Sequence, residues 1–234
     1  MGIDWSKKSG WRHDRQEEGE KVNLQREQML LYAVTDRSRL GKKSLIQAVE
    51  EALEAGVTLV QYREKELSQD ELVAEARKLH GVTMRYRVPL IINDDVETAF
   101  KAEAEGVHLG QEDAAISYAR RRLGPEKIIG VTAHTVDEAL AAEAAGADYL
   151  GAGAVFQSTT KNNTIPMSLD TLTAICNAVT IPVVAIGGIT KGNIRTLQGS
   201  GISGVAVVSA IFAAQQIGDE TRELKSLIKK IIGR

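Results

Sequence analysis

A repeated pattern of helix, glycine and strand is the feature of this sequence that most constrains its fold. Three segments, EALEAGVTLV, KAEAEGVHLG and AAEAAGADYL, each combine an alanine-rich stretch, a glycine and a short apolar run. Because glycine suits the left-handed position that ends a helix, we expect Gly56, Gly106 and Gly146 to adopt that conformation. Helices and strands therefore alternate along the chain.

The alternation predicts strands near 30–34, 57–62, 90–93, 106–109, 128–131, 148–152, 182–187 and 204–208. It predicts helices near 44–55, 69–80, 96–104, 114–122, 136–145, 169–178, 191–199 and 221–232. Continuously apolar strands such as LIIN are typical of a parallel sheet buried on both faces. Eight such units in about 200 residues favour an α/β fold of the closed (β/α)8 TIM barrel type. A doubly wound open sheet is the alternative, because periodicity does not reveal closure.

Composition excludes several other classes of protein. The 234 residues are 43% hydrophobic with a formal net charge of -2, which describes an ordinary soluble chain. The single cysteine, Cys176, cannot form an internal disulfide, and no paired C-x-x-C zinc motif is present. The 29 basic and 31 acidic residues create no global field for nucleic acid. Without a membrane-length apolar run or a signal peptide, we expect a cytoplasmic protein with no membrane contact.

The first part of the chain differs in composition from the rest. Residues 1–27 carry many charges and few apolar side chains apart from Trp5 and Trp11, so we expect a mobile N-terminal extension. An arm that packs both tryptophans on the body or on a second subunit is the alternative. Residues 28–234 are expected to form one catalytic barrel domain. Whether the chain forms a homo-oligomer is left open.

Polar residues follow the expected second strand, at the end where TIM barrels gather their functional groups. Alternation places Gln61, Arg63 and Lys65 on one side of that strand. Three polar groups on an inner side are costly unless a ligand uses them, which favours an anion site. A solvated strand end with exposed charges is the alternative.

Acidic residues follow the third and fourth strands. We expect Asp94 and Asp113 to meet around one Mg²⁺ ion, a hard cation that takes oxygen ligands. Asp95 and Glu112 are instead expected at helix N-termini. His108 is either a hydrogen-bonded core histidine or a ligand contact.

Hydroxyl groups mark the next two strand ends. Thr132 is expected to offer a hydroxyl at the mouth of the barrel, and Thr135 to cap the following helix. The long loop from Phe156 to Pro166 carries Ser158, Thr159, Thr160 and Lys161, a set suited to phosphate oxygens. A surface loop without function is the alternative.

The last two strand ends predict a phosphate site. Gly188 would let an anion approach bare backbone, and a helix beginning at Ser209, after Val208, would direct its N–H groups to the same point. This is the phosphate position described for TIM barrels, although a tight turn that merely uses glycine is the alternative. Together with the first anion site it implies a monophosphate and a diphosphate with Mg²⁺, and displacement of the diphosphate.

Six ordered segments between residues 30 and 212 also resemble thiamine phosphate synthase. They are VQYREK at 60–65, INDD at 92–95, GVHLGQED at 106–113, GVTAHT at 130–135, TK at 160–161 and IGGI at 186–189. The resemblance implies a TIM-barrel transferase that joins an aminopyrimidine methyl diphosphate to a thiazole phosphate and releases pyrophosphate with Mg²⁺.

The resemblance also implies roles for individual residues. It assigns the pyrimidine diphosphate to Gln61, Arg63, Lys65, Asn93, Thr132 and Lys161, Mg²⁺ to Asp94 and Asp113, and the thiazole phosphate to Ser158, Thr160, Gly188, Val208 and Ser209. In a dissociative reaction, Arg63, Lys65 and Lys161 would be the catalytic groups that neutralise the departing diphosphate.

The chain departs from the family pattern in places. Thr132 stands where many members have serine, and Asn162 and Asn163 follow Lys161 where lysine and aspartate are usual. Two other functions compete: a thiazole tautomerase-like isomerase on the same barrel, and a non-catalytic sensor of phosphate ligands. Retention of the residues expected at the diphosphate site argues against the isomerase.

Overall fold

Eight parallel strands form a closed barrel in the computed structural model, which describes residues 26–111, 115–157 and 166–233. The strands are β1 Leu31–Val34, β2 Leu59–Tyr62, β3 Leu90–Asn93, β4 Gly106–Leu109, β5 Ile128–Ala133, β6 Tyr149–Gly153, β7 Val183–Ile186 and β8 Gly204–Val207. Each strand pairs with the next in the chain, and β8 pairs back with β1, placing Leu31 opposite Val205. This pairing confirms the TIM barrel and excludes the open sheet.

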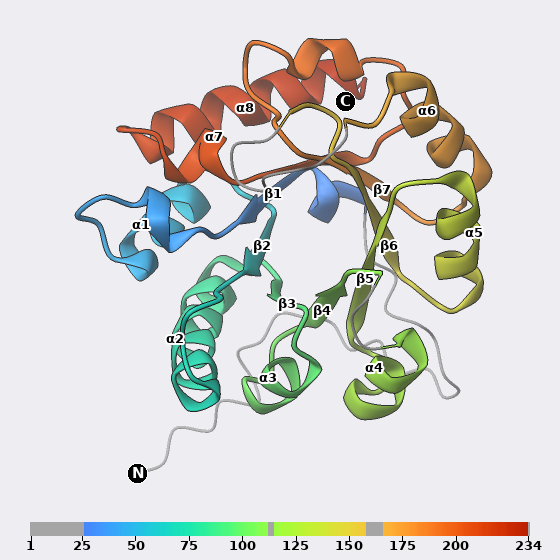
Figure 1. Ribbon diagram of the computed structural model, residues 1–234. Coiled ribbons are helices and arrows are strands. Elements are labelled where there is room, and N and C mark those ends of the chain that lie inside the picture. The colour runs from blue at the N-terminus through green and yellow to red at the C-terminus, as the bar shows by residue number, and fades with distance from the viewer. Residues whose placement is uncertain (1–25, 112–114, 158–165, 234) are drawn as a thin grey trace.

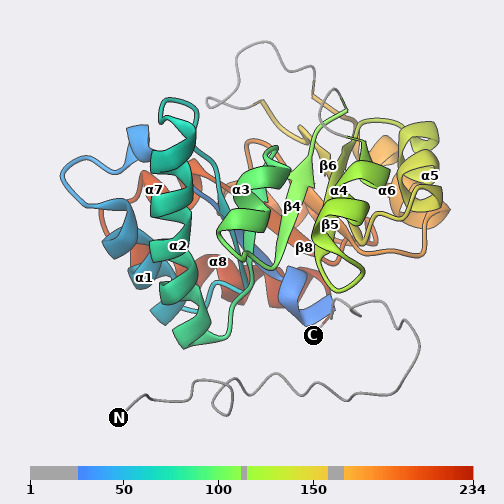
Figure 2. The same ribbon diagram turned by 90° about the horizontal axis from the view of Figure 1, so that it is seen from below.

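Helices surround the strands, as the view in Figure 1 shows. They are α1 Leu45–Glu54, α2 Gln69–Tyr86, α3 Val96–Lys101, α4 Ile116–Leu123, α5 Val136–Ala144, α6 Leu169–Ala178, α7 Ser209–Phe212 and α8 Ile217–Ile231. Short 3-10 turns are η2 Arg26–Met29, η3 Arg37–Arg39 and η4 Ile194–Leu197. The end of α8 lies beside η2, where Ile231 and Ile232 line one pocket with Arg26, and Figure 2 shows this side of the barrel at the bottom of the view.

The helix expected over 191–199 is wrong, because only the four-residue turn η4 forms there. The side chain of Asn193 accepts a hydrogen bond from the backbone of Thr190 and donates one to the carbonyl of Gly188. Such local side-chain bonds compete with helical ones. Conversely, α2 runs past the expected end near 80, to Tyr86.

Side chains cap several helices. Ser44 and Gln47 form a capping box at α1, while Asp95 and Thr135 accept bonds from the first turns of α3 and α5, as expected. At the C-terminal ends of helices, the structure confirms the left-handed conformation expected for two of the three glycines: Gly56 and Gly146 have φ of 103° and 96°.

Gly106 corrects the third of those expectations. The left-handed residue after α3 is Glu103, with φ of 58°, and Gly106 is instead the first residue of β4. A Cβ atom at Gly106 would overlap the backbone of Ile128 on the neighbouring strand. Glycine is therefore required here for close strand packing rather than for a helix end.

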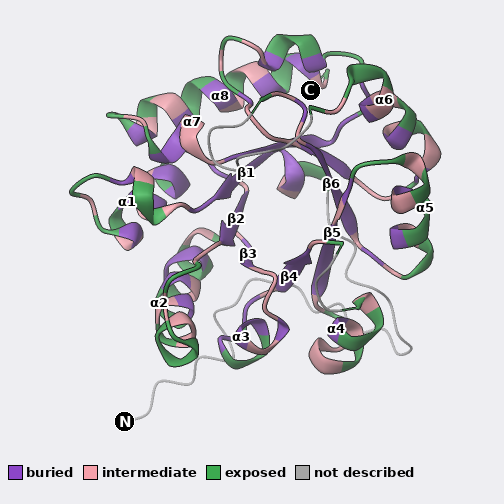
Figure 3. Cartoon of the chain, in the orientation of Figure 1, coloured by how far each residue is buried: buried purple, intermediate pink, exposed green. Residues whose placement is uncertain are grey.

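The buried apolar side chains form two clusters. Figure 3 shows that the strands and parts of the surrounding helices are buried. The larger cluster lies between the strands and the helices. The smaller fills the barrel and comprises Met29, Tyr32, Val34, Leu59, Ile91, Ile128, Tyr149, Val184 and Ala206. Burying a large apolar side chain contributes about 1.5–3 kcal/mol.

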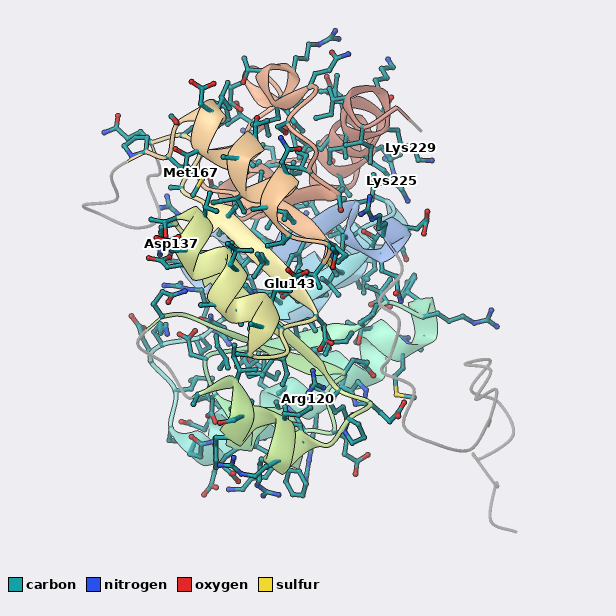
Figure 4. All side chains as sticks on the ribbon, turned by 90° about the vertical axis from the view of Figure 1, so that its right-hand side faces the viewer. Arg120, Asp137, Glu143, Met167, Lys225 and Lys229 are labelled. Atoms are coloured by element: carbon teal, nitrogen blue, oxygen red, sulfur yellow. The ribbon has the colours of Figure 1, made fainter. Side chains whose placement is uncertain are left out.

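Arg120, labelled on α4 in Figure 4, ties together the N-terminal ends of β5 and β6. Its guanidinium donates to the carbonyls of Lys127 and Gly146 and, at 2.6 Å, to the carboxylate of Asp148. Asp148 in turn accepts a bond from the backbone of Ile129. This end of the barrel thus carries a structural ion pair.

Within the described part of the chain, none of the helices has the length and hydropathy needed to cross a membrane.

Candidate active site

Polar side chains gather at the C-terminal ends of neighbouring strands. Register pairs Asn93 at the end of β3 with His108 in β4, and Thr132 lies in β5 next to them. Gln61 is in β2 and is only 5% exposed. The structure therefore brings together Gln61, Asn93 and Thr132, which the sequence predicted there from three separate strand ends, and it places His108 among them.

The segment after β2 is held from both sides. The hydroxyl of Thr35, a fully buried residue, accepts a bond from the backbone N–H of Arg63 and donates one to its carbonyl. The carboxylate of Glu64 accepts bonds from Arg37 and from the backbone N–H of Lys65. Burial alone would raise the pKa of Glu64, but these hydrogen bonds bring it below its usual value. The backbone that carries Arg63 and Lys65 is thereby fixed.

The Arg63 side chain is half-buried and makes no hydrogen bond or ion pair with the side chains that the structure describes. A half-buried guanidinium with unused donors is suited to bind an anionic ligand. Lys65 is more exposed, at 53%, and pairs with Asp94. Binding of an anion by these two side chains stays a prediction.

Asp94 has a strained backbone, and its carboxylate contacts the side chains of two other predicted site residues. Its φ is 63°, a left-handed value that is uncommon outside glycine, and its N–H donates to the carbonyl of His108 at 2.8 Å. One carboxylate oxygen accepts from Lys65 at 2.6 Å and the other from Asn93 at 2.7 Å. Asp94, Lys65 and Asn93 thus form a single contact group.

Asp95, next in the chain, has the structural role that was expected. Its carboxylate accepts from the backbone and the hydroxyl of Thr98 and from Gln69. Burial opposes ionisation, yet the bonds from Thr98 and Gln69 lower the pKa of Asp95 below its usual value. Of the two adjacent aspartates, only Asp94 faces the candidate site.

A chain of buried hydrogen bonds runs across the top of the barrel interior. The Gln61 amide nitrogen lies 2.6 Å from the Tyr32 hydroxyl, which lies 2.8 Å from that of Tyr149. The two ring nitrogens of His108 lie 2.9 Å from the Tyr149 hydroxyl and 3.0 Å from that of Thr132. Burial raises the pKa of both phenols above the usual range, so both keep their proton. His108 is therefore a buried, hydrogen-bonded residue whose partner Thr132 lies at the mouth.

Sequence reasoning missed Tyr32 and Tyr149. Alternation along β6 places Tyr149 on the same side as Gly151, and Gly130 lies opposite it on β5. A Cβ atom at Gly130 would overlap the Tyr149 ring, and one at Gly151 would lie 3.1 Å from the His108 ring. Two glycines in strand interiors were thus the signal that large rings fill the barrel there.

The ends of β7 and β8 also meet. Ile186 pairs with Ala206, so Gly188 and Val208, each two residues further on, follow adjacent strands. Gly188 has φ of 62°, and a Cβ atom there would overlap the backbone of Gln157. Ser209 begins α7, as expected. Of the positions expected to bind a monophosphate, those at 188 and 208–209 therefore follow adjacent strands, with glycine required at 188.

Several expected site residues lie outside the described residues. These are Asp113, Ser158, Thr160 and Lys161, together with Glu112, Thr159, Asn162 and Asn163. Among the residues that are described, no three His, Cys, Asp or Glu side chains are grouped to hold a metal ion. The metal pair and the role of Lys161 thus stay predictions.

The barrel and its mouth define a class: a TIM-barrel protein with charged and polar side chains gathered at the C-terminal ends of its strands. Residues 31–211 match the family model described as thiamine monophosphate synthase. The chain belongs to this family, which confirms the resemblance drawn from its motifs.

Individual relatives agree with the family match. The chain is 46% identical over 200 residues to the thiamine-phosphate synthase of Clostridium acetobutylicum, covering 86% of this chain and 95% of the relative. It is 45% identical over 209 residues to thiamine-phosphate synthase 2 of Streptococcus pneumoniae, covering 89% and 100%.

One solved structure is similar in both fold and sequence. The thiamine phosphate pyrophosphorylase from Pyrococcus furiosus superposes with a TM-score of 0.81 at 38% identity, covering 89% of this chain and 99% of that one. The similarity extends over nearly the whole of that protein.

Proposed function

We propose that the chain is a thiamine phosphate synthase, a transferase that joins an aminopyrimidine methyl diphosphate to a thiazole phosphate and releases pyrophosphate. The observation that carries the proposal is the contact group of Asp94, Lys65 and Asn93, beside the half-buried Arg63. It places a carboxylate and two cations at one mouth, which is what binding of a diphosphate with a divalent ion requires. Family membership supports the same activity.

The donor set of the mouth fits Mg²⁺. Asp94 offers a partly exposed carboxylate, a hard oxygen ligand, and its pairing with the exposed Lys65 is one that solvent and ligand can exchange. We propose that Asp94 and Asp113 hold the ion. Bound Mg²⁺ would supply positive charge to the oxygens of the diphosphate.

The chain's own residues would then bind the two substrates at separate subsites. Arg63, Lys65 and Lys161 neutralise the departing diphosphate, while Gln61, Asn93 and Thr132 hold the pyrimidine. The thiazole phosphate is bound, and its thiazole nitrogen oriented towards the pyrimidine methylene, by residues of the last loops: Ser158, Thr160, Gly188, Val208 and Ser209. Because the electron-rich aminopyrimidine stabilises a methylene cation, positioning and charge stabilisation are sufficient for this dissociative route. No general base is needed when the new bond forms.

The competing functions differ in their need for a diphosphate site. A thiazole tautomerase-like isomerase would not require Arg63, Lys65 and Asp94 together, and a phosphate sensor would bind without turnover. We further propose that the enzyme acts in the cytoplasm on small-molecule substrates, with no nucleic acid partner, and that residues 28–234 form one catalytic domain with residues 1–27 as an extension. The oligomeric state is left open.

A pyrophosphate-release assay tests the function. We expect release only when the pyrimidine diphosphate, the thiazole phosphate and Mg²⁺ are all present, so each is omitted in turn. Lys161→Ala should reduce turnover by about 100-fold or more, a typical loss when charge stabilisation of a transition state is removed. An unchanged circular dichroism spectrum would show that the fold is retained. Release without the thiazole phosphate, or near-normal turnover of Lys161→Ala, would contradict the proposed role.

A further inference from the structure

The buried hydrogen-bond chain from Gln61 to Thr132 has a direction. We propose that this direction fixes which hydrogen-bonding groups the mouth presents to the pyrimidine, and that Tyr32 is the positioning residue that orients Gln61. The inference rests on the proposed function, since it concerns how the same site selects its pyrimidine substrate.

The direction begins at Gln61. Its amide nitrogen donates to the Tyr32 hydroxyl at 2.6 Å, which leaves the amide oxygen as the group that a ligand can meet. A hydroxyl has one proton to donate. Because Tyr32 already accepts from Gln61, its own proton goes to the Tyr149 oxygen, 2.8 Å away.

The same reasoning continues to the other end. Tyr149 accepts from Tyr32 and therefore donates to Nδ1 of His108, at 2.9 Å. Neutral His108 then carries its proton on Nε2 and donates it to the Thr132 hydroxyl, at 3.0 Å. Thr132 is left with a proton to donate. The mouth thus presents an acceptor at Gln61 and a donor at Thr132.

Reversal of the chain is all-or-none. If the Gln61 amide turned over, Tyr32 would donate to it, and each following bond would reverse as far as Thr132. A partial reversal leaves two donors or two acceptors facing each other in the buried interior, where Tyr32 and Tyr149 are 2% and 0% exposed. Such a mismatch is costly in a low-dielectric environment. The two ends of the chain are therefore coupled, although 71 positions separate Gln61 from Thr132 in the sequence.

The direction that follows from the Gln61 donation matches an aminopyrimidine. An exocyclic amino group is a donor and suits the amide oxygen of Gln61, and a ring nitrogen is an acceptor and suits the hydroxyl of Thr132. An oxopyrimidine presents the opposite pattern, an acceptor oxygen beside a ring N–H donor. The hydrogen-bond chain would accordingly select the amino form over the oxo form.

Binding measurements test this selection. Isothermal titration calorimetry with Mg²⁺, but without the thiazole phosphate, compares the aminopyrimidine methyl diphosphate with its oxo analogue, so no turnover occurs. We expect the wild-type protein to prefer the amino compound by about 10- to 100-fold, the range for one mispaired buried polar group. Tyr32→Phe frees the Gln61 amide to turn over, so the preference should fall to about threefold or less.

Two further variants separate a directional chain from a local contact. Tyr149→Phe does not touch Gln61 but removes the acceptor for the Tyr32 proton, so Tyr32 can donate to Gln61 and the preference should fall as well. Ile91→Val trims an apolar side chain of the same interior cluster and should keep the wild-type preference. Thermal unfolding of each variant verifies that it is folded.

The outcomes are distinct. An unchanged preference in Tyr32→Phe would overturn the positioning role, and an unchanged preference in Tyr149→Phe alone would overturn the coupling along the chain. An equal loss in Ile91→Val would show that general packing, rather than hydrogen-bond direction, sets the selection. If wild-type protein bound neither diphosphate, the proposed function itself would fail.

Discussion

Replacing Gly130 with alanine tests the packing that supports the interior hydrogen-bond chain. Gly130 pairs with Tyr149 across β5 and β6, and a Cβ atom at position 130 would occupy space now taken by the Tyr149 ring. The ring is fully buried and bonded to Tyr32 and His108, so it cannot move without loss of those contacts.

The expected loss follows from these contacts. Overpacking of a core costs about 1–3 kcal/mol, and each buried hydrogen bond that breaks costs about 1 kcal/mol more. We therefore expect Gly130→Ala to lower the free energy of unfolding by about 4 kcal/mol. For a chain of this size the midpoint of thermal unfolding should fall by about 8–16 °C.

Urea unfolding followed by circular dichroism measures the change as a shift in midpoint at constant slope. Gly81→Ala is a matched control, because a Cβ atom there meets nothing within 4 Å and the residue lies inside α2. The free energy of unfolding of that variant should rise by about 0.5–1 kcal/mol.

In the double variant Gly130→Ala with Tyr149→Leu, the free energy of unfolding should fall by less than the sum of the two single losses. The difference should be at least about 1 kcal/mol. A loss below about 1 kcal/mol in Gly130→Ala, or strict additivity in the double variant, would refute the reasoning.

Three further outcomes follow from other contacts. Arg120→Ala should lower the free energy of unfolding by about 3–5 kcal/mol, measured in urea, because it removes the ion-pair partner of the Asp148 carboxylate, which is only 9% exposed; an effect under about 1 kcal/mol would contradict this. The hydrogen bond from Arg122 lowers the pKa of Glu97 to about 2. The wild-type protein should therefore be more stable than Glu97→Gln by a constant amount above pH 4.5, and this difference in the free energy of unfolding should disappear as the pH falls towards 2 and Glu97 is protonated. Urea midpoints across that range measure it, and a pH-independent difference would argue against the pairing. Asp94→Asn should raise the Mg²⁺ concentration for half-maximal pyrophosphate release by about tenfold or more, and an unchanged value would remove Asp94 from the metal site.

Local patterns in the sequence were sufficient to predict the barrel and most of its elements. Apolar runs and caps such as Asp95 and Thr135 lie where they were expected, because short-range periodicity and capping chemistry determine them. The segment 191–199 differs because Asn193 bonds to neighbouring backbone groups, a contact that helical periodicity does not reveal.

The site residues that lie at strand ends were predictable from the sequence, and those placed by contacts between distant strands were not. Gln61 and Asn93 lie near the C-terminal ends of β2 and β3, and Asp94 follows β3, so barrel topology alone brings them together. Gly130 and Gly151 signal that large rings fill the barrel, but the pairing of Tyr32 with Tyr149 joins strands far apart in sequence, so no local pattern identifies the partners. The expected roles of Asp113 and Lys161 stay predictions.

The seam between β1 and β8 has a consequence for synthesis of the chain. Leu31 finds its partner only when Val205 has been made, so the last ladder of the barrel waits for almost the entire polypeptide. A nascent or truncated chain that stops short of β8 presents β1 and β7 as open edges, which can pair with strands of other molecules. Early termination in this protein would therefore favour aggregation over a smaller folded product.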